Sequence, residues 1–466
     1  MMKKIISIAL ASLCVCGTLS ACGESNADTT SPVQTAKTWE YTQATNIVYD
    51  CLGGDGSVMP LLGFWSAPGD AAYNGQFFPE MKDDEYFAAV QESGVNLIVQ
   101  ANDDGKYNDV VVETTLSYCD DYNLGYYVTN RALIDVGLIC NKNELLQKTQ
   151  EYAKHKSFAG YYVKDEPMPN AQESAVNASI KTIAEITEEL GINAHQYTTI
   201  FPYEIGRFSA DPWTLYPKYI KDIYEGSGAV NVQYDIYCLR RSGFAYENFY
   251  TNLTMIRKAA KEMNTSWIPY VSVSGEDNED KDYLMPSEGQ LGWQVNQYVA
   301  FGAKGVSYFP MNSPISFAEE VMNGDTVAMF DWTGNKTEVY YYVKEINKQL
   351  LAADEYLMNA TNHGVIFHGN MPGEQYLKDS EVIEDGEFRE LKSVSGSNAF
   401  IGCFDVYGKT CLYVVNGDME KDASLTLRFD DRYGYTLIQR GQKANVKGSK
   451  INLSLAAGEA ALIALK

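Results

Sequence analysis

The sequence has few of the residues on which metal and nucleophile chemistry depends. Its 466 residues include only four histidines, none in the HExxH spacing of zinc hydrolases, and none of the nine cysteines forms a CxxC pair. No GxSxG motif and no phosphate-binding loop occurs, and no GxGxxG follows the first expected strand. These absences argue against a metallohydrolase, a serine hydrolase and a nucleotide-binding enzyme, and we expect no cofactor.

Basic residues and long apolar runs are also scarce. The 37 Lys and Arg residues face 61 Asp and Glu residues, which gives a net charge of −24. Proteins that bind nucleic acids need clustered Lys and Arg, so this balance argues against a nucleic-acid partner. No stretch approaches the roughly 20 apolar residues of a membrane-spanning helix. Tyrosine is abundant, with 34 residues, and this composition suits planar neutral ligands better than charged ones.

The N-terminus has the parts of a bacterial export signal. Two lysines precede an apolar run over residues 5–16, and the LSAC tetrapeptide that ends at Cys22 resembles a lipobox. An ordinary signal peptide with an incidental cysteine is the alternative. Residues 23–45 are polar, as suits a flexible tether. We therefore predict that residues 1–22 are a lipoprotein signal peptide, and that lipidated Cys22 anchors an exported protein to a membrane of the cell envelope.

Eight short apolar runs alternate with longer amphipathic stretches in the first two thirds of the chain. They cover residues 61–66, 95–100, 125–130, 159–164, 194–200, 230–238, 267–272 and 305–310. Such strands, separated by helices that end at glycine, indicate a parallel sheet covered by helices. Eight units fit a (β/α)₈ TIM barrel over residues 46–362, closed by a helix over residues 340–359. A doubly wound open sheet is the alternative.

The pattern changes after Gly364. Short apolar runs are separated there by Gly, Asp and Asn, which is typical of an antiparallel β-sandwich, and we assign it to residues 363–466. This region contains no Trp, so we expect it to brace the barrel rather than to bind sugar. Cys403 and Cys411 flank an expected turn, and we expect buried free thiols rather than a disulfide.

Acidic residues follow or interrupt two of the barrel strands. In a barrel, catalytic groups lie where the strands end, and the fourth run delivers Asp165 and Glu166, followed by Pro167, to that end. Adjacent acids after a buried strand are costly unless they are paired or used, so an ion pair or a helix cap is the alternative to catalysis. Asp235 lies within the sixth run, where an acid among apolar residues is unusual.

The segment GYYVKDEP, which contains Asp165 and Glu166, resembles the fourth strand of clan A-type glycoside hydrolase barrels. The likeness is greatest to uncharacterised bacterial secreted members that carry Asp-Glu-Pro. Residues 291–295 and 303–309 resemble the seventh helix and eighth strand of these proteins, and the ending LSLAAGEAALIALK resembles the last strand of their C-terminal β-sandwich. In pattern, the resemblance covers most of the mature chain.

The resemblance implies two carboxylates around a glycosidic bond. Glu166 would be the general acid/base, with a pKa raised by partial burial. The family nucleophile is usually a Glu that ends the seventh strand, and here Glu276 is the nearest acid, although it is also typical of a solvated acidic loop. Asp235 is the rival for the second carboxylate. Asp165 stands where the family more often has Asn, and an ionised Asp accepts a sugar hydroxyl bond but cannot donate one.

Aromatic and amide residues at the strand ends are candidates for sugar binding, because rings stack on apolar sugar faces. Together with Asp165, these predicted substrate-binding residues are Trp65, Asn102, Asn130, Tyr203, Tyr237 and Tyr308. Core packing is the alternative for each aromatic residue. We therefore predict a glycoside hydrolase that cleaves an oligo- or polysaccharide with two carboxylates. A non-catalytic carbohydrate-binding lipoprotein on the same barrel is the rival hypothesis.

Overall fold

The computed structural model describes most of the chain after residue 57. The described residues are 58–65, 84–100, 109–130, 134–135, 138–139, 141–204, 208, 210–277, 282–312, 328–331, 334–377 and 382–466. The predicted signal peptide with Cys22 and the predicted tether lie outside them. Within the described ranges, none of the helices combines the length and the apolar character that a membrane crossing requires.

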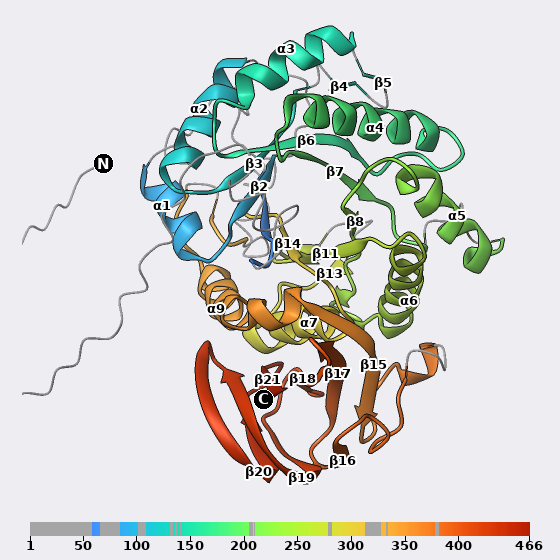
Figure 1. The fold of residues 1–466 in the computed structure, drawn as a ribbon, viewed down its shortest axis with the longest axis vertical. Helices are drawn as coiled ribbons and strands as arrows, with labels where there is room; N and C mark the ends of the chain where they lie inside the picture. Colours follow the sequence, from blue (N-terminus) through green and yellow to red (C-terminus); the bar gives the residue numbers. More distant parts are fainter. Residues whose placement is uncertain are drawn as a thin grey trace, which may run out of the picture. The chain divides into compact units, whose positions relative to one another are not determined.

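Eight parallel strands form a closed barrel, as predicted (Figure 1). In barrel order they are β1 (Leu61–Trp65), β2 (Leu97–Gln100), β3 (Gly125–Val128), β6 (Phe158–Asp165), β7 (His195–Ile200), β8 (Asn231–Tyr234), β11 (Ser266–Ser272) and β14 (Val306–Phe309). Each overlaps one of the predicted apolar runs. Because Leu61 of β1 pairs with Val306 of β14, the sheet closes on itself, and the open-sheet alternative is wrong.

Helices cover the outer side of the barrel (Figure 1). They are α1 (Asp84–Glu92), α2 (Asp109–Asp121), α3 (Lys142–Tyr152), α4 (Glu173–Leu190), α5 (Pro212–Tyr224), α6 (Tyr246–Glu262), α7 (Glu288–Ala300) and α9 (Glu338–Met358). Local sequence explains their ends. Gly191 adopts the left-handed conformation after α4, and Ser287 forms a capping box with Gln290 at the start of α7.

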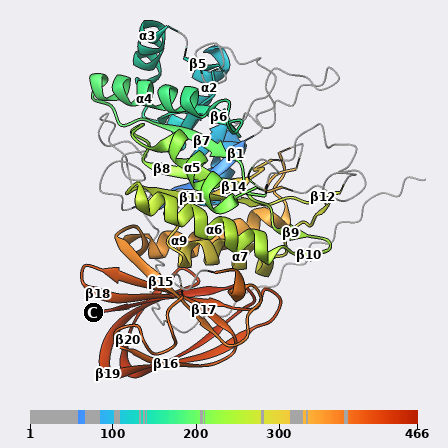
Figure 2. The same ribbon diagram turned by 90° about the vertical axis from the view of Figure 1, so that its right-hand side faces the viewer.

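Short strands in the loops between these elements are all antiparallel. β4 (Ile134–Asp135) pairs with β5 (Leu138–Ile139). A four-stranded sheet combines β9 (Leu239–Arg240) and β10 (Gly243–Phe244), which follow the sixth barrel strand, with β12 (Glu276–Asp277) and β13 (Asp282–Tyr283), which follow the seventh. Figure 2 shows β9, β10 and β12 together at one end of the barrel. This small sheet therefore stands beside the carboxyl ends of the barrel strands.

Aromatic side chains fill the barrel interior. The ring of Phe64 lies 5.6 Å from that of Tyr162 and 5.5 Å from that of Tyr270. The Tyr197 hydroxyl donates to Ser307 Oγ at 3.2 Å, and Thr199 Oγ1 donates to the Tyr270 hydroxyl at 2.8 Å. Most of the largest fully buried side chains of the described residues are tyrosines. Much of the tyrosine excess therefore serves the core rather than a ligand.

The C-terminal domain is one antiparallel sheet of seven strands. They are β15 (Ala360–His368), β16 (Leu391–Gly396), β17 (Ala399–Val406), β18 (Lys409–Asn416), β19 (Ala423–Gln439), β20 (Gln442–Leu455) and β21 (Ala460–Leu465), with a 3₁₀ turn, η4 (Glu374–Tyr376), after β15. The long strand β19 changes register with β20 between Arg428 and Tyr433. Leu425 of β19 and Leu412 of β18 share one apolar core, as expected for a separate C-terminal β domain. Cys403 and Cys411 are buried free thiols, which confirms that prediction.

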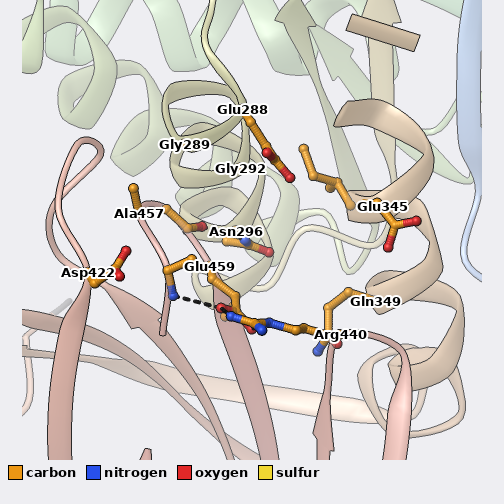
Figure 3. Close-up of a pocket in the computed structure, with 14 residues that line it drawn as sticks. Glu288, Gly289, Gly292, Asn296, Glu345, Gln349, Asp422, Arg440, Ala457 and Glu459 are labelled. Atoms are coloured by element: carbon orange, nitrogen blue, oxygen red, sulfur yellow. Dashed lines mark hydrogen bonds and ion pairs between the residues drawn. The ribbon is translucent and has the colours of Figure 1, made fainter. Parts of the chain in front are cut away.

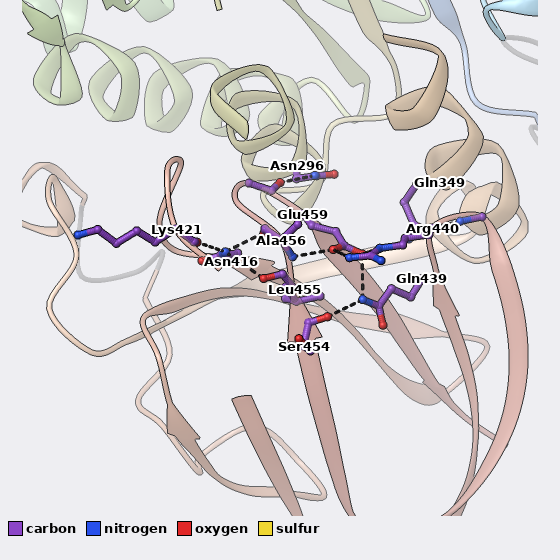
Figure 4. Close-up of polar contacts among 12 residues, drawn as sticks. Asn296, Gln349, Asn416, Lys421, Gln439, Arg440, Ser454, Leu455, Ala456 and Glu459 are labelled. Atoms are coloured by element: carbon purple, nitrogen blue, oxygen red, sulfur yellow. Dashed lines mark hydrogen bonds and ion pairs between the residues drawn. The ribbon is translucent and has the colours of Figure 1, made fainter. Parts of the chain in front are cut away.

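The C-terminal sheet packs against α7 and α9 of the barrel (Figure 1). The Tyr413 hydroxyl donates to Asn296 Oδ1 at 2.7 Å, and Asn296 Nδ2 donates to the Gly458 carbonyl at 2.9 Å. Beside this contact lies a groove of about 360 Å³, lined by α7, α9 and residues 456–460 (Figure 3). The Arg440 guanidinium forms two bonds of 2.9 Å to the Glu459 carboxylate at its edge (Figure 4). Polar bonds and close apolar packing therefore join the two domains.

Glycine at position 458 is required by this contact. Gly458 has a φ of +64°, and a Cβ there would overlap the Gly289 carbonyl oxygen and lie 2.6 Å from the Trp293 backbone nitrogen. We expect Gly458→Ala to lower the free energy of unfolding by about 3 kcal/mol or more, from backbone strain and overpacking together. Gly408→Ala is the matched control, since Gly408 has a φ of +82° but nothing within 4 Å of its Cβ position. Gly408→Ala should lower the free energy of unfolding, measured by urea denaturation, by only about 1–2 kcal/mol. Equal losses of unfolding free energy in the two variants would contradict the close contact at Gly458.

Candidate functional site

A cavity of about 380 Å³ lies at the carboxyl end of the barrel strands. Residues that follow the fourth to eighth strands line it, together with residues of the small sheet. They are Glu166, Pro202, Glu204, Asp235, Ile236, Tyr237, Arg240, Ser272, Ser274, Tyr283 and Phe309. Carboxyl ends of barrel strands are where enzymes of this fold hold their reactive groups. Three carboxylates, one guanidinium and three aromatic rings thus share one space.

Glu166 enters the cavity through an irregular end of β6. The register of β6 against β7 shifts between Tyr162 and Lys164, which marks a bulge just before the acidic pair. The Glu166 amide donates to the Thr199 carbonyl at 2.9 Å, and its φ of +44° lies in the left-handed region. A proline disfavours helical backbone conformations of the residue before it. The left-handed conformation of Glu166, which precedes Pro167, is therefore strained. Strain of this kind is concentrated at functional sites.

Asp235 follows the end of β8 and is half-buried. Its Oδ1 has no hydrogen-bond partner among the described residues. Burial raises the pKa of Asp235 well above its ordinary value, and the negative charges of Glu166 and Asp165 raise it further. Asp235 is therefore a carboxyl group that retains its proton more strongly than an exposed aspartate does.

Glu204 is a third carboxylate of the cavity that the sequence analysis missed. It lies four residues beyond the end of β7, and Asn252 Nδ2 on α6 donates to its Oε2 at 2.8 Å. Burial raises the pKa of Glu204, while the Asn252 bond and the charge of Arg240 act in the opposite direction. The feature of the sequence that could have identified Glu204 is its position next to the predicted Tyr203. The pattern did not show which of the two neighbours faces the cavity.

Helices α5 and α6 hold the segments that carry these acids. The Tyr219 hydroxyl donates to the Pro167 carbonyl at 2.7 Å, directly after Glu166. The Tyr216 hydroxyl donates to the Phe201 carbonyl at 2.7 Å, and Asn252 Oδ1 accepts from the Tyr203 amide at 2.9 Å. Both segments after β6 and β7 are therefore fixed by buried side chains of neighbouring helices.

Aromatic rings form one wall of the cavity. The Tyr237 ring stacks on Phe309 with centroids 5.7 Å apart and planes inclined by 20°. Tyr283 meets Tyr237 edge to face at 5.7 Å. Burial raises the pKa of Tyr237 well above its ordinary value, and Asp235 raises it further, so its hydroxyl stays protonated. The wall offers flat apolar faces beside neutral hydroxyl groups.

Besides Asp165, three of the predicted substrate-binding residues do not line the cavity. Tyr308 is fully buried, and its hydroxyl donates to Asn347 on α9 at 2.6 Å. Strand alternation explains the error, since Ser307 bonds inside the barrel and the next residue must face outward. Asn130 is buried and donates to the Tyr152 hydroxyl at 3.0 Å, and half-buried Tyr203 packs against the core beneath the helices.

The remaining predicted site residues are absent from the cavity lining or lie wholly or partly outside the described residues. Asp165 is exposed at the end of β6 and acts on the cavity through its charge. Glu276 lies in β12, a two-residue strand within the loop after β11, where its backbone pairs with Tyr283. The side chains of Glu276 and Trp65, and all of Asn102, lie outside the described residues. Where the family resemblance implies a nucleophile after the seventh strand, Ser272 and Ser274 line the cavity.

A second cavity, of about 560 Å³, adjoins the small sheet. Arg240 lines both cavities. The second cavity is bounded by β9 and β10, by Tyr246 of α6, and by residues 417–420 of the C-terminal domain. The C-terminal domain therefore contributes to a cavity next to the candidate site.

The fold is shared with solved glycosidases. No family model and no curated protein matches the sequence. A GH42 beta-galactosidase from G. stearothermophilus, solved as a catalytic mutant, is 8% identical with a TM-score of 0.55, over 88% of this chain and 98% of that one. Alpha-galactosidase I from Mortierella vinacea is 10% identical with a TM-score of 0.45, over 88% of this chain and 97% of that one. At such identities, the likeness shows the barrel fold alone.

The raised pKa of Asp235 predicts a gain in stability when its charge is removed. Because the folded protein binds the Asp235 proton more tightly than the unfolded chain does, stability falls as the pH rises above the ordinary pKa of 3.8. Asp235→Asn should raise Tm by a few degrees at pH 7, and the gain should vanish near pH 3. Thermal unfolding between pH 3 and pH 7 measures this gain in Tm. Glu384→Gln, a change at an exposed residue, is the control. A lower Tm at pH 7 would contradict the burial argument.

Proposed function

We propose that the protein is a glycoside hydrolase that uses Glu166 and Asp235 as its pair of carboxyl groups. The observation that carries the proposal is their placement: both line one cavity at the carboxyl end of a closed barrel, beside an aromatic wall. Their electrostatic interaction supports a coupled role, because the charge of Glu166 raises the pKa of Asp235. Glycosidic bond cleavage requires two carboxyl groups on either side of the bond, one of which donates a proton.

The burial of Asp235 favours a definite division of roles. A general acid must hold a proton at neutral pH, and burial raises the pKa of Asp235 well above its ordinary value. Asp235 then protonates the oxygen of the leaving group, and ionised Glu166 stabilises or attacks the sugar carbon from its strained position. The family resemblance implies the reverse assignment, with Glu166 as the acid. The two assignments differ in which variant, Asp235→Asn or Glu166→Gln, should keep activity on a substrate with a good leaving group.

The aromatic wall would hold the sugar. The face of Tyr237 and the ring of Tyr283 suit the apolar face of a pyranose, and the Ser272 hydroxyl can donate to or accept from a sugar hydroxyl. Glu204, fixed by Asn252, can accept a further hydroxyl bond. The second cavity leaves room for an oligosaccharide that extends beyond the first sugar.

Variants of the two carboxyl groups test the proposal on substrates with different leaving groups. Asp235→Asn should lower kcat/KM for a disaccharide by about 10³-fold, because it cannot donate the proton. On a 2,4-dinitrophenyl glycoside, the kcat/KM of Asp235→Asn should fall by only about 10-fold, because this leaving group needs little protonation. Glu166→Gln should lose about 10³-fold or more on both substrates. Steady-state kinetics on a panel of both anomers measures these values.

Controls separate loss of chemistry from loss of structure. Glu384→Gln, on the C-terminal domain, should match the wild type with both substrates. Circular dichroism should show that each variant folds. If Glu166→Gln rather than Asp235→Asn keeps activity on the activated glycoside, the reverse assignment holds. If neither variant changes hydrolysis of a confirmed substrate, the cavity is not the active site.

A non-catalytic carbohydrate-binding protein is the second candidate function. One observation favours it: among the described residues, serines rather than a carboxylate line the cavity after the seventh strand, where the resemblance implies the nucleophile. Under this alternative, the wild type binds sugars by calorimetry but hydrolyses none of the panel. Binding without hydrolysis would therefore overturn the proposed enzymatic function and retain the carbohydrate ligand.

We also propose that the protein is exported and anchored by lipid at Cys22. The lipobox-like sequence and the polar segment after it support this proposal. Expressed in a bacterial host fed an alkyne fatty acid, the wild type should carry the label and partition into membranes. Cys22→Ala should lose the label, whereas Cys16→Ala, in the same N-terminal segment, should keep it. Label that persists in Cys22→Ala would contradict the anchor.

A further inference from the structure

Among the described residues, Arg240 has no ion-pair partner, although it lines the candidate site. It lies on β9, where its backbone pairs with Gly243 and Tyr283, and its half-buried side chain lines the cavity. Its Nε is inaccessible to solvent and has no hydrogen-bond partner among the described residues. Burying a donor without an acceptor is costly, so such a group needs a compensating ligand or function.

Other arginines of the described chain differ from Arg240 in this respect. Arg440 forms a two-pronged pair with Glu459, and Arg389 pairs with Asp405 at 2.5 Å. Buried Arg257 donates to the Phe301 carbonyl at 3.1 Å and to Asn362 at 2.6 Å. The fold thus supplies acceptors to these arginines. No carboxylate of the described residues forms an ion pair with Arg240.

The orientation of Arg240 is nevertheless fixed. Its guanidinium carbon lies 5.6 Å from the centroid of the Tyr283 ring. Stacking on a ring occupies the face of a guanidinium and leaves the N–H groups at its edge for other partners. Because both Arg240 and Tyr283 line the cavity, the arrangement presents a preoriented fork of donors beside the proposed sugar site.

We propose that the sugar bound in this cavity carries a carboxylate, as a uronic acid does, and that Arg240 binds that carboxylate. A planar carboxylate matches the guanidinium edge and accepts two parallel hydrogen bonds, whereas a neutral hydroxymethyl group has a single oxygen and cannot form this two-pronged pair. The inference deepens the proposed function, on which it rests for the identity of the ligand as a sugar. It names the substrate class as an acidic glycoside.

Two of the three acids that line the cavity carry less negative charge than exposed acids do, whereas Glu166 is the ionised group of the proposed reaction. Burial raises the pKa of both Asp235 and Glu204, which lowers the negative charge that they carry. In the second cavity, which Arg240 also lines, the Asp418 carboxylate is engaged by the amides of Glu420 and Lys421. Arg241 lines that cavity as well, so two adjacent cations border it.

A competing role for Arg240 is to balance the charge of Glu204. Its positive charge acts to lower the pKa of that carboxyl. Charge balance would serve neutral and acidic sugars alike, because it operates through the protein rather than through the ligand. Selectivity between a sugar and its uronate therefore separates the two roles.

Matched pairs of substrates test the proposal. The wild type should show a kcat/KM for 4-nitrophenyl glucuronides or galacturonides that exceeds that of the glucosides or galactosides by roughly 10- to 100-fold. Arg240→Gln should lower this ratio by a similar factor, and Arg240→Lys should restore only part of it, because Lys keeps the charge but lacks the fork. Arg428→Gln, an exposed change on β19, is the control. An unchanged ratio in Arg240→Gln would overturn the proposal.

Binding to the Glu166→Gln variant separates this inference from the proposed reaction. Calorimetry with D-glucuronate and D-galacturonate, against glucose and galactose, should show preference for the uronates that disappears in Glu166→Gln/Arg240→Gln. If the uronates bind in preference to the neutral sugars but the wild type hydrolyses no glycoside, the hydrolase proposal is wrong. The proposal that Arg240 binds a sugar carboxylate is then retained. If the wild type hydrolyses only neutral glycosides, the hydrolase proposal stands and the role of Arg240 is wrong. Unfolding temperatures confirm that each variant is folded.

Discussion

Hydrogen-bond pairing between β1 and β14 is the constraint on which the site depends. The two strands stand at opposite ends of the barrel sequence, and their parallel register closes the sheet into a ring. Closure directs the residue after every strand toward the same end of the ring. Glu166, Glu204 and Asp235, which follow three different strands, thereby meet in one cavity. In an open sheet the same residues would be spread along an edge.

Bringing three carboxylates together is unfavourable unless the surroundings hold them in place. The tyrosines of α5 and Asn252 of α6 supply that support through bonds to the backbone after β6 and β7. These helices are fixed in turn by their apolar faces against the barrel. Burial, rather than a neighbouring cation, dominates the proton affinity of Asp235. The stability of the barrel thus sustains both the position and the protonation of the acids.

The barrel was predictable from the sequence because strands covered on both faces are continuous apolar runs, which stand out against amphipathic helices. The direction of side chains at the strand ends was not. A bulge in β6 precedes Glu166, and the choice between Tyr203 and Glu204, or between Ser307 and Tyr308, depends on a shift of one residue. Arg240 lies on a two-residue strand in a loop, whose path depends on pairing with a distant hairpin rather than on periodicity.

The abundance of tyrosine first indicated a neutral ligand, yet most of the largest buried tyrosines lie in the core and away from the cavity. Average composition therefore describes how the barrel is filled, whereas a few polar groups decide what a cavity accepts. The C-terminal domain illustrates the same distinction. Its backbone packs closely against α7 at Gly458, and the same docking places residues 417–420 beside the cavity that Arg240 shares. Close packing and ligand access are thus consequences of one interface.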